Sequence, residues 1–344
     1  MAVDAVITWV DGSDPAHRRK LAAYLGKLPH ARPAAADATR FDDSGEIEYC
    51  IASLLRFAPW LGTIFIVSDA QSPALLQQLA GTRFAERVRV VDHREIFRGY
   101  ERYLPTFSNR AIEAMLWRIP GLAEHFLYLN DDFQLIQPVA VEDFFSANGV
   151  VLRGRWRVSS SRRRSAAAKR QIIALAWRLG LIDMEARALA RPGNHTAQQL
   201  SARMAGYEDR YFQVPHCPHP ARKSVLAEYF AAHPAQLEGN LRQRLRSSEQ
   251  FLTLTLANHL ELRSGSATID NRLRPVRLKP ASQWRSSLLR QLGRADRDPS
   301  VAFACVQSLD LATASKRALI LAWLDRRVGR LATLIDARLS SKDP

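Results

Sequence analysis

Short apolar runs alternate with stretches of helical periodicity along the first 150 residues. The run Val3 to Val10 ends at a cluster of turn-forming residues, and similar runs occupy 63–67, 88–91 and 126–129. Between them, residues 46–57 and 111–116 carry apolar side chains every three or four positions. Short apolar runs bounded by turn signals predict buried strands, and the second pattern predicts amphipathic helices. This alternation predicts an α/β fold with a mainly parallel sheet flanked by helices.

Polar residues follow these predicted strands at the point where each one ends. Asp11 follows the first run and Asp69 the second, and Asn130-Asp131-Asp132 comes directly after the run at 126–129. In parallel α/β sheets, ligands bind at the carboxyl ends of the strands. Adjacent carboxylates on a tight turn can hold Mg²⁺ or Mn²⁺ while the metal bridges nucleotide phosphates. The alternative is that the pair only caps a turn.

The charge of the chain is distributed very unevenly. The 344 residues carry 49 Lys and Arg against 34 Asp and Glu, a formal charge of +15. Residues 1–150 hold 15 basic and 19 acidic residues, a net charge of −4, which leaves +19 for the remainder. Such asymmetry predicts an anionic partner such as a polyanionic polymer, a phosphate-bearing molecule or an anionic membrane surface.

The second half divides further by composition. Ten basic residues stand against two acidic ones between 151 and 190, in an otherwise Ala- and Leu-rich pattern, which predicts a basic helical insertion over 151–212. Residues 316–339 have helical spacing with arginines on one side. We therefore divide the chain into a ligand-binding α/β half (1–150), the basic insertion (151–212), a completion of the core (213–312) and a basic amphipathic C-terminal helix (313–344).

Several classes of protein are excluded by what the sequence lacks. It has three scattered cysteines, no secretory leader at its start and no uninterrupted apolar window of about 18 residues, so we expect a cytoplasmic protein without a membrane span. It has no GxxxxGK[ST] or GxGxxG motif. Despite the basic half, it has no aromatic-interleaved basic motif, zinc module or helix-turn-helix pattern, so we expect no nucleic-acid partner.

A proline-rich loop in the second half holds two histidines. His216 and His219 lie three residues apart in PHCPHP, and Arg222-Lys223 follow. Cations near a histidine lower its pKa and keep it neutral, so that it can accept a proton from a hydroxyl nucleophile. The alternatives are a purely structural loop or a zinc site with Cys217, and standard zinc spacing is missing.

Two further features are candidates for ligand binding. Arg242, Arg244 and Arg246 precede a Ser-Ser-Glu stretch, and guanidinium groups grip phosphates and stabilise the charge of phosphoryl transfer. Surface arginines on a solvated helix are the alternative. Trp9 could stack on a base or a sugar, or could simply belong to the core.

These stretches together resemble the Stealth family, which includes bacterial capsular polysaccharide phosphotransferases and the animal N-acetylglucosamine-1-phosphotransferase. The resemblance has four blocks in order: Asp4 to Pro15, Arg40 to Asp132, Val214 to Leu262 and, most weakly, Phe303 to Asp310. The second block is the longest, with the phrases RFDDSGEIEYCIASLLRFAPWLGTIFIVSDAQ, LPTFSNRAIEAMLWRIPGL and HFLYLNDD. The fold it implies is Rossmann-like or GT-A-like.

The resemblance implies transfer of a hexose 1-phosphate from a UDP-sugar, with UDP-GlcNAc as one candidate, to a glycan hydroxyl, with release of UMP and growth of a phosphodiester-linked polymer. It implies Mg²⁺ or Mn²⁺ on Asp131 and Asp132, and it puts His216 and His219 in the family's His-containing loop and Arg246 at the arginine of a family motif. Our hypothesis for the mechanism is that one of the two histidines deprotonates the acceptor hydroxyl while Arg246 with Lys223 stabilises the transferred phosphate. The other implied donor-binding and catalytic positions are Trp9, Asp11, Gly12, Arg40, Asp43, Glu46, Asp69 and Gln71, with Asp11 expected to act in the transfer itself. We also place Asn109, Asn130 and Ser247 among the substrate-binding residues.

The sequence departs from the family pattern at a few positions. Ser44 stands where Asn is common, and Ser108-Asn109 varies the phrase after PTF. Gln307-Ser308 replaces an Asn-Asp pair, so Asp310 becomes a substitute ligand in the fourth block. The rival function is a metal-dependent glycosyltransferase, in which the same donor would be attacked at its anomeric carbon and release UDP. For the basic insertion and the terminal helix, we expect contact with a polyanionic product or with the inner membrane face.

Overall fold

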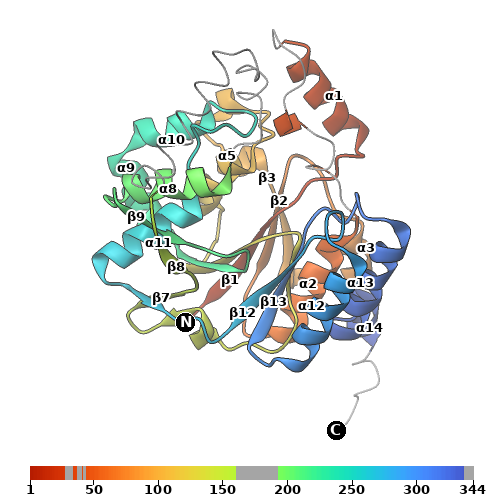
Figure 1. Ribbon diagram of the computed structural model, residues 1–344. Helices are drawn as coiled ribbons and strands as arrows, with labels where there is room; N and C mark the ends of the chain where they lie inside the picture. The colour runs from red at the N-terminus through yellow and green to blue at the C-terminus, as the bar shows by residue number, and fades with distance from the viewer. Residues whose placement is uncertain (28–33, 37–40, 42–43, 160–192, 337–344) are drawn as a thin grey trace, which may run out of the picture.

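A five-stranded sheet lies at the centre of the molecule (Figure 1). The computed structural model describes residues 1–27, 34–36, 41, 44–159 and 193–336. The strand order is β10-β4-β1-β2-β3. The bounds of these strands, in chain order, are β1 Val3–Thr8, β2 Ile64–Ser68, β3 Val88–Asp92, β4 His125–Asn130 and β10 His219–Arg222.

The pairing of the strands confirms the predicted fold class. Strand β1 pairs in parallel with both β2 and β4, and β2 pairs in parallel with β3. Strand β10 is antiparallel to β4, with His219 opposite Tyr128. The four apolar runs of the first half thus form four neighbouring parallel strands, and their carboxyl ends meet at one edge of the sheet. The fold is a mainly parallel α/β sheet flanked by helices, as the sequence predicted.

Alternate residues of β1 pack into different cores on the two faces of the sheet. Ala5 and Ile7 belong to one hydrophobic cluster and Val6 to the other. Because successive side chains of a strand point to opposite faces, a fully apolar strand requires a cover on both sides. The cover on the first face is made by α2 Glu46–Phe57, α3 Leu75–Leu79, α12 Arg285–Arg297, α13 Ala314–Arg327 and α14 Leu331–Asp336. The cover on the second face is made by α5 Asn109–Glu113, α9 Lys223–Ala232, α10 Pro234–Leu241 and α11 Thr253–Ser264 (Figure 1).

Helix α2 spans the residues that the sequence predicted. Glu46 and Glu48 lie in its first turn and Arg56 in its last, a distribution that suits the helix dipole. Ten of its twelve residues are buried. The second predicted helix is shorter than expected, since 111–116 is divided between α5 and a 3₁₀ turn at Leu116–Arg118.

Smaller sheets attach the second half of the chain to this core. Strand β12, Arg274–Leu278, pairs in parallel with β13, Val301–Val306, which pairs antiparallel with β5, Phe133–Leu135. The backbone N–H of Val306 donates to the Asp132 carbonyl at 3.0 Å. The C-terminal part of the chain is thereby fixed beside the predicted acidic pair.

The remaining elements lie around these sheets. They are α1 Pro15–Leu25, α4 His93–Ile96, β6 Phe145–Ser146, β7 Gly149–Leu152, β8 Arg155–Val158, α8 Asn194–Met204, β9 Arg210–Gln213 and β11 Ala267–Ile269. Strands β6, β7 and β11 form one three-stranded sheet, and β8 and β9 form an antiparallel pair.

The predicted basic insertion is only partly helical where it is described. Strand β8 opens it and β9 closes it, because Arg155–Val158 pairs with Arg210–Gln213 and so joins its two ends. Residues 160–192, which include most of the basic run, lie outside the described residues. The predicted terminal helix is two helices, α13 and α14, interrupted where Gly329 adopts a positive φ of 83°. Its last residues, 337–344, also lie outside the described part.

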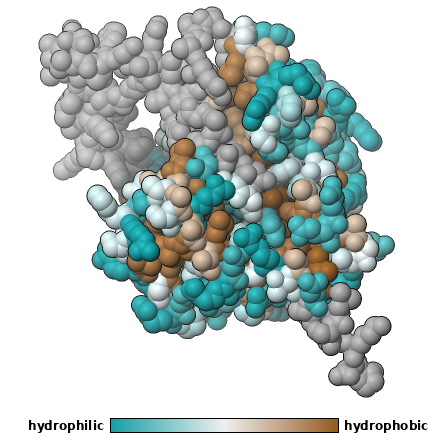
Figure 2. Space-filling view, turned by 90° about the vertical axis from the view of Figure 1, so that its right-hand side faces the viewer, coloured by the Kyte–Doolittle hydropathy of each residue, from teal (hydrophilic) through white to brown (hydrophobic). Residues whose placement is uncertain are grey.

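The described helices include none that is long and apolar enough to cross a membrane. The face shown in Figure 2 is largely hydrophilic, with separate hydrophobic areas between the polar ones. The expected contacts of the basic segments with a polyanion or a membrane stay predictions.

Candidate active site

A cavity of about 500 Å³ opens at the carboxyl edge of the central sheet. Because the strand order is known, its lining can be followed from one side of the sheet to the other. His93 follows β3, Asp69 follows β2, Trp9 follows β1 and Asp131 follows β4. His219 opens β10, which is antiparallel and therefore begins at this edge. This is the place where α/β sheets commonly bind their ligands.

Most of the predicted site residues line this one cavity, although they come from distant parts of the sequence. They are Trp9, Glu46, Asp69, Asn109, Asn130, Asp131, Asp132, His216, His219 and Arg246, joined by Asp310 of the fourth block. Trp9 is 7% exposed and belongs to the main hydrophobic core, and its stacking on a base or sugar stays a prediction. Arg40 and Asp43 lie outside the described residues.

Asp11, Gly12 and Gln71 lie next to the lining without being part of it. The Asp11 N–H donates to the Gln71 side-chain oxygen at 3.0 Å, and the Gln71 amide donates back to the Asp11 carbonyl at 2.8 Å. A Cβ on Gly12 would collide with the backbone of Phe41. Glycine is therefore required here for the close approach of two backbone segments. In this structure these residues hold the β1 and β2 loops together.

Lys223 is not brought to the cavity. Its backbone N–H donates to the Glu124 carbonyl at 2.8 Å, just ahead of β4, which places it at the amino edge of the sheet. Strand β10 runs from the carboxyl edge of the parallel strands toward their amino edge, so His219 and Lys223 lie at opposite edges of the sheet. The prediction that Lys223 acts with Arg246 is therefore wrong. Ser247 lies beside Arg246, and its carbonyl accepts a hydrogen bond from Arg110 at 2.7 Å.

The acidic pair stands on the turn between β4 and β5. The Cys305 thiol donates to Oδ2 of Asp132 at 3.5 Å, and Oδ1 is buried without a hydrogen-bond partner among the described residues. Burial raises the pKa of Asp132 to about 6. A buried carboxylate oxygen without a partner is costly unless a proton or a cation satisfies it.

These residues fit a divalent cation in one particular way. No group of three or more His, Cys, Asp or Glu side chains suited to a metal ion occurs within the described residues. Mg²⁺ commonly binds through one or two carboxylates and completes its shell with water and substrate phosphates. Asp131 and Asp132 line the cavity, and the unpartnered Oδ1 of Asp132 suits that mode of binding.

The two predicted histidines flank the aromatic ring of Phe133. Its ring centroid lies 6.2 Å from that of His216 and 6.2 Å from that of His219, which also stacks on Tyr128 at 6.3 Å. Burial lowers the pKa of His216 to about 4, assisted by Arg277 and Lys279. Burial, assisted by His216, lowers the pKa of His219 to about 3. Both rings are neutral at pH 7, as predicted.

The cations that lower the pKa of His216 are not the ones that the sequence predicted. Arg222 pairs with Glu261 through two hydrogen bonds of 2.7 Å, at the far end of β10 from His219. Arg277 and Lys279, from the end of β12, take the place that the sequence assigned to Arg222 and Lys223. Short sequence separation was misleading here because a strand carries the chain away from the site.

Arg246 belongs to a chain of polar side chains in the wall of the cavity. Its Nε donates to Oδ1 of Asn109 at 2.6 Å, and Nδ2 of Asn109 donates to Glu113 at 3.2 Å. Of the three predicted arginines it is the one in the lining, since Arg242 is exposed and Arg244 donates to the Arg102 carbonyl at 2.8 Å.

Glu113 and Tyr128 are site residues that the sequence did not reveal. The Tyr128 hydroxyl lies 3.3 Å from Glu113 and 2.8 Å from the side-chain oxygen of Asn130. Burial raises the pKa of Glu113 to about 7, against the opposing influence of Arg246 and Arg110. In the sequence, Glu113 is one polar position of a helical pattern and Tyr128 one aromatic residue of a strand, so no local signal marks either.

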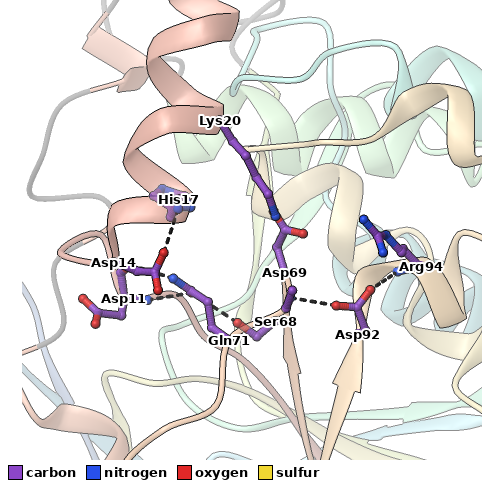
Figure 3. A network of polar contacts seen from close by, with 10 residues as sticks. Asp11, Asp14, His17, Lys20, Ser68, Asp69, Gln71, Asp92 and Arg94 are labelled. Carbon is purple, nitrogen blue, oxygen red and sulfur yellow. Dashed lines mark hydrogen bonds and ion pairs between the residues drawn. The ribbon is translucent and has the colours of Figure 1, made fainter.

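The ends of β1, β2 and β3 form a second polar group at the other end of the cavity (Figure 3). Lys20 reaches from α1 to Asp69, at 2.8 Å. Asp92 accepts from the backbone N–H groups of Ala70 at 2.7 Å and Arg94 at 2.8 Å, which ties the β2 loop to the start of α4. These contacts fix the two loops against each other and against α1.

Two conserved regions of a known family match the first half of the chain. Stealth protein CR1, conserved region 1, matches residues 1–29, and Stealth protein CR2, conserved region 2, matches residues 40–152. Trp9, Asp69, Asp131 and Asp132 fall inside these regions, whereas His216, His219, Arg246 and Asp310 fall outside them. The third and fourth blocks of the predicted resemblance stay predictions.

Curated proteins match over the same part of the chain. An exopolysaccharide phosphotransferase of Streptomyces coelicolor, SCO6021, is 49% identical over 148 residues, which are 43% of this chain and 26% of that protein. The capsular polysaccharide phosphotransferase cps1A of Actinobacillus pleuropneumoniae is 41% identical over 150 residues, 43% of this chain and 39% of that protein. The receptor polysaccharide phosphotransferase WefC of Streptococcus oralis is 38% identical over 148 residues, 43% of this chain and 42% of that protein. The chain thus matches less than half the length of each of these relatives.

Among solved structures, the apo form of mouse xyloside xylosyltransferase 1 aligns over 89% of this chain and 97% of its own. The sequence identity is 10% and the TM-score is 0.37. The sequence matches are what identify the relationship. As its motifs predicted, the chain carries conserved regions 1 and 2 of the Stealth proteins.

Proposed function

We propose that this protein is a polysaccharide phosphotransferase that moves a hexose 1-phosphate from a UDP-sugar to a glycan hydroxyl and releases UMP. The relatives named above are exopolysaccharide, capsular and receptor polysaccharide phosphotransferases. The observation that carries the proposal is the content of the cavity, where an acidic pair, Arg246 and two neutral histidines line one space. Phosphoryl transfer from a charged donor requires electrostatic stabilisation and a base for the nucleophile.

The bond changes of the proposed reaction balance without a further reactant. The acceptor oxygen attacks the phosphorus that carries the sugar, and the bond from that phosphorus to the oxygen bridging it to UMP breaks. The sugar phosphate becomes a phosphodiester with the acceptor, and UMP leaves with the bridging oxygen. The proton of the acceptor hydroxyl passes to an imidazole nitrogen of His216 or His219.

Neutral imidazoles are suited to this role because they can accept the proton at pH 7. Their pKa values in the ligand-free protein, about 4 and about 3, leave both unprotonated. The negative charges of a bound donor favour the imidazolium form, so donor binding raises the basicity of whichever histidine faces it. The acceptor is therefore activated only once the donor is in place.

Arg246 would stabilise the transferred phosphate. Its contact with Asn109 orients the guanidinium, whose planar donors match phosphate oxygens. Asp131 and Asp132 would hold Mg²⁺ or Mn²⁺, which neutralises charge on the phosphates when it is bound. Asp310 lines the same cavity and remains a candidate additional ligand.

The proposal is tested by incubating the purified protein with Mg²⁺, a short glycan acceptor and a panel of UDP-hexoses that includes UDP-GlcNAc. We expect one donor to give stoichiometric UMP, with a new phosphodiester signal in the ³¹P spectrum of the glycan. Release of UDP that depends on the acceptor would instead indicate the rival glycosyltransferase reaction and overturn the proposal.

A further inference from the structure

Two histidines at the β2–β3 end of the cavity have ring nitrogens without partners. His17, on α1, is 6% exposed, and His93, at the start of α4, is 4% exposed. Nε2 of His17 and both ring nitrogens of His93 are buried with no hydrogen-bond partner among the described residues. Both side chains line the cavity. Unsatisfied buried polar atoms are costly to a fold, and at a cavity wall a ligand can satisfy them.

The protonation state of these nitrogens indicates which kind of ligand group they can bind. Burial lowers the pKa of both histidines, and that of His93 to about 4, so they are neutral at pH 7. A neutral imidazole presents one N–H donor and one nitrogen acceptor. His93 can therefore donate a hydrogen bond through one ring nitrogen and accept one through the other.

The surroundings favour a flat, uncharged ring over a phosphate. The ring of His17 packs 5.2 Å from that of Phe41 and 5.6 Å from that of Phe107, and both phenylalanines line the cavity. Lys20, a cation on α1, is paired with Asp69 at 2.8 Å (Figure 3). A phosphate would meet the Asp69 carboxylate here, whereas Arg246 and Arg277 line the cavity elsewhere.

We propose that His17 and His93 bind the base of the nucleotide donor through the edge of a uracil-type imide, in which carbonyl acceptors flank an N–H donor. This inference rests on the proposed function, since it assigns one end of the same donor. Strands β3 and β4 are separated by β2 and β1, so their ends lie three strand spacings apart, about 14 Å. A nucleoside with two phosphates spans a distance of this order, which brings its sugar-bearing phosphate to the acidic pair.

The test measures binding without turnover, by titration calorimetry with UMP, CMP, AMP and inorganic pyrophosphate as probes. We expect the unmodified protein to bind UMP more tightly than CMP and AMP. His93→Phe should weaken UMP binding about 10-fold or more and remove the preference for uracil, since it removes both hydrogen-bonding nitrogens. Pyrophosphate, which has no base, should bind both proteins alike.

Two further variants keep the result interpretable. His17→Phe, next to two phenylalanines, tests the same edge if His93→Phe fails to fold, and should weaken UMP binding while sparing pyrophosphate. His233→Phe is the matched control, because His233 is exposed and does not line the cavity, and it should bind all four probes as the unmodified protein does. Unchanged UMP affinity and base preference in the folded His17 or His93 variants would overturn the inference.

The two proposals fail in different ways. If the unmodified protein transfers sugar phosphate while the histidine variants bind UMP normally, the base site is wrong and the function stands. If the variants lose uracil binding as expected but no UDP-sugar gives a phosphodiester, the base site stands and the proposed reaction is wrong.

Discussion

The Nε of Arg246 donates a 2.6 Å hydrogen bond to the side-chain oxygen of Asn109, a residue 137 positions earlier in the chain. Asn109 opens α5, and its amide donates in turn to Glu113 at the end of that helix. This contact ties the guanidinium of Arg246 to a short helix, and a positioning role for Asn109 follows.

Loss of this contact should affect catalysis more than donor binding. We expect Asn109→Ala to lower kcat about 10-fold with little change in the KM for the donor, because the guanidinium keeps its charge but loses its orientation. Arg246→Lys should lower kcat by about 100-fold or more, since lysine lacks the planar fork. Steady-state kinetics with Arg242→Lys, an exposed arginine outside the lining, provide the control. A rise in KM at constant kcat would show that Arg246 only binds the donor.

Glu113 should make the stability of the protein depend on pH. Its pKa is about 7 in the folded protein against an ordinary value of 4.5, so its stabilising contribution is complete below about pH 4.5 and is lost as the pH rises through 7. Glu113→Gln removes the buried charge, so at pH 8 this variant should gain about 3 kcal/mol in free energy of unfolding relative to the unmodified protein. At pH 5 most of the difference should vanish.

Urea denaturation at the two pH values measures this difference. Glu142→Gln serves as a control because the side chain of Glu142 is exposed. A Glu113→Gln variant less stable than the unmodified protein at pH 8 would mean that the carboxylate is held ionised by Arg246 and Arg110.

The acidic pair should be responsible for any dependence on a divalent cation. Asp131→Asn and Asp132→Asn should abolish the increase in melting temperature that Mg²⁺ with a UDP-sugar gives to the unmodified protein. Asp143→Asn, whose carboxylate accepts from the Ala140 N–H on a distant turn, is the control. Thermal melts with Mg²⁺, with Mn²⁺ and with chelator test this. An undiminished rise in melting temperature in a variant that carries both substitutions would place the cation elsewhere.

The two histidines can be separated by their effects on turnover. Alanine at the base should reduce turnover to background and leave UDP-sugar binding intact, whereas alanine at the other position should give a partial loss. Asparagine at the same position should not rescue the base, because it cannot accept the proton at neutral pH. Calorimetry with the UDP-sugar and single-turnover rates distinguish the two, and loss of donor binding would make that histidine a substrate-holding or structural residue.

Much of the fold could be predicted because its signals are local. The four parallel strands and α2 lie where short apolar runs and helical spacing placed them, and Asp69 and Asp131 line the same cavity because parallel strands share an edge. The acidic pair followed from the same rule. The position of a residue along a regular strand or helix can be predicted without knowing which distant residues it contacts.

Contacts between distant segments could not be predicted in the same way. Glu113 gains its environment from Arg246, far along the chain, and His93 is distinguished by two buried nitrogens without a partner, which no spacing reveals. Lys223 was misplaced because a strand separates it from His219. Lys223 follows His219 closely in the sequence, which suggested that the two lie close together in space. Strand β10 instead runs toward the amino edge of the sheet and takes Lys223 away from the cavity.

The most direct measurement of the proposed reaction follows the phosphorus that carries the sugar. The protein is incubated with Mg²⁺, a glycan acceptor and the preferred UDP-sugar labelled with ³²P at the β-phosphate, and the products are separated. Phosphoryl transfer predicts the label in the glycan and an equal amount of unlabelled UMP. Label retained in UDP, with an unlabelled sugar added to the glycan, would show attack at the anomeric carbon and contradict sugar-1-phosphate transfer.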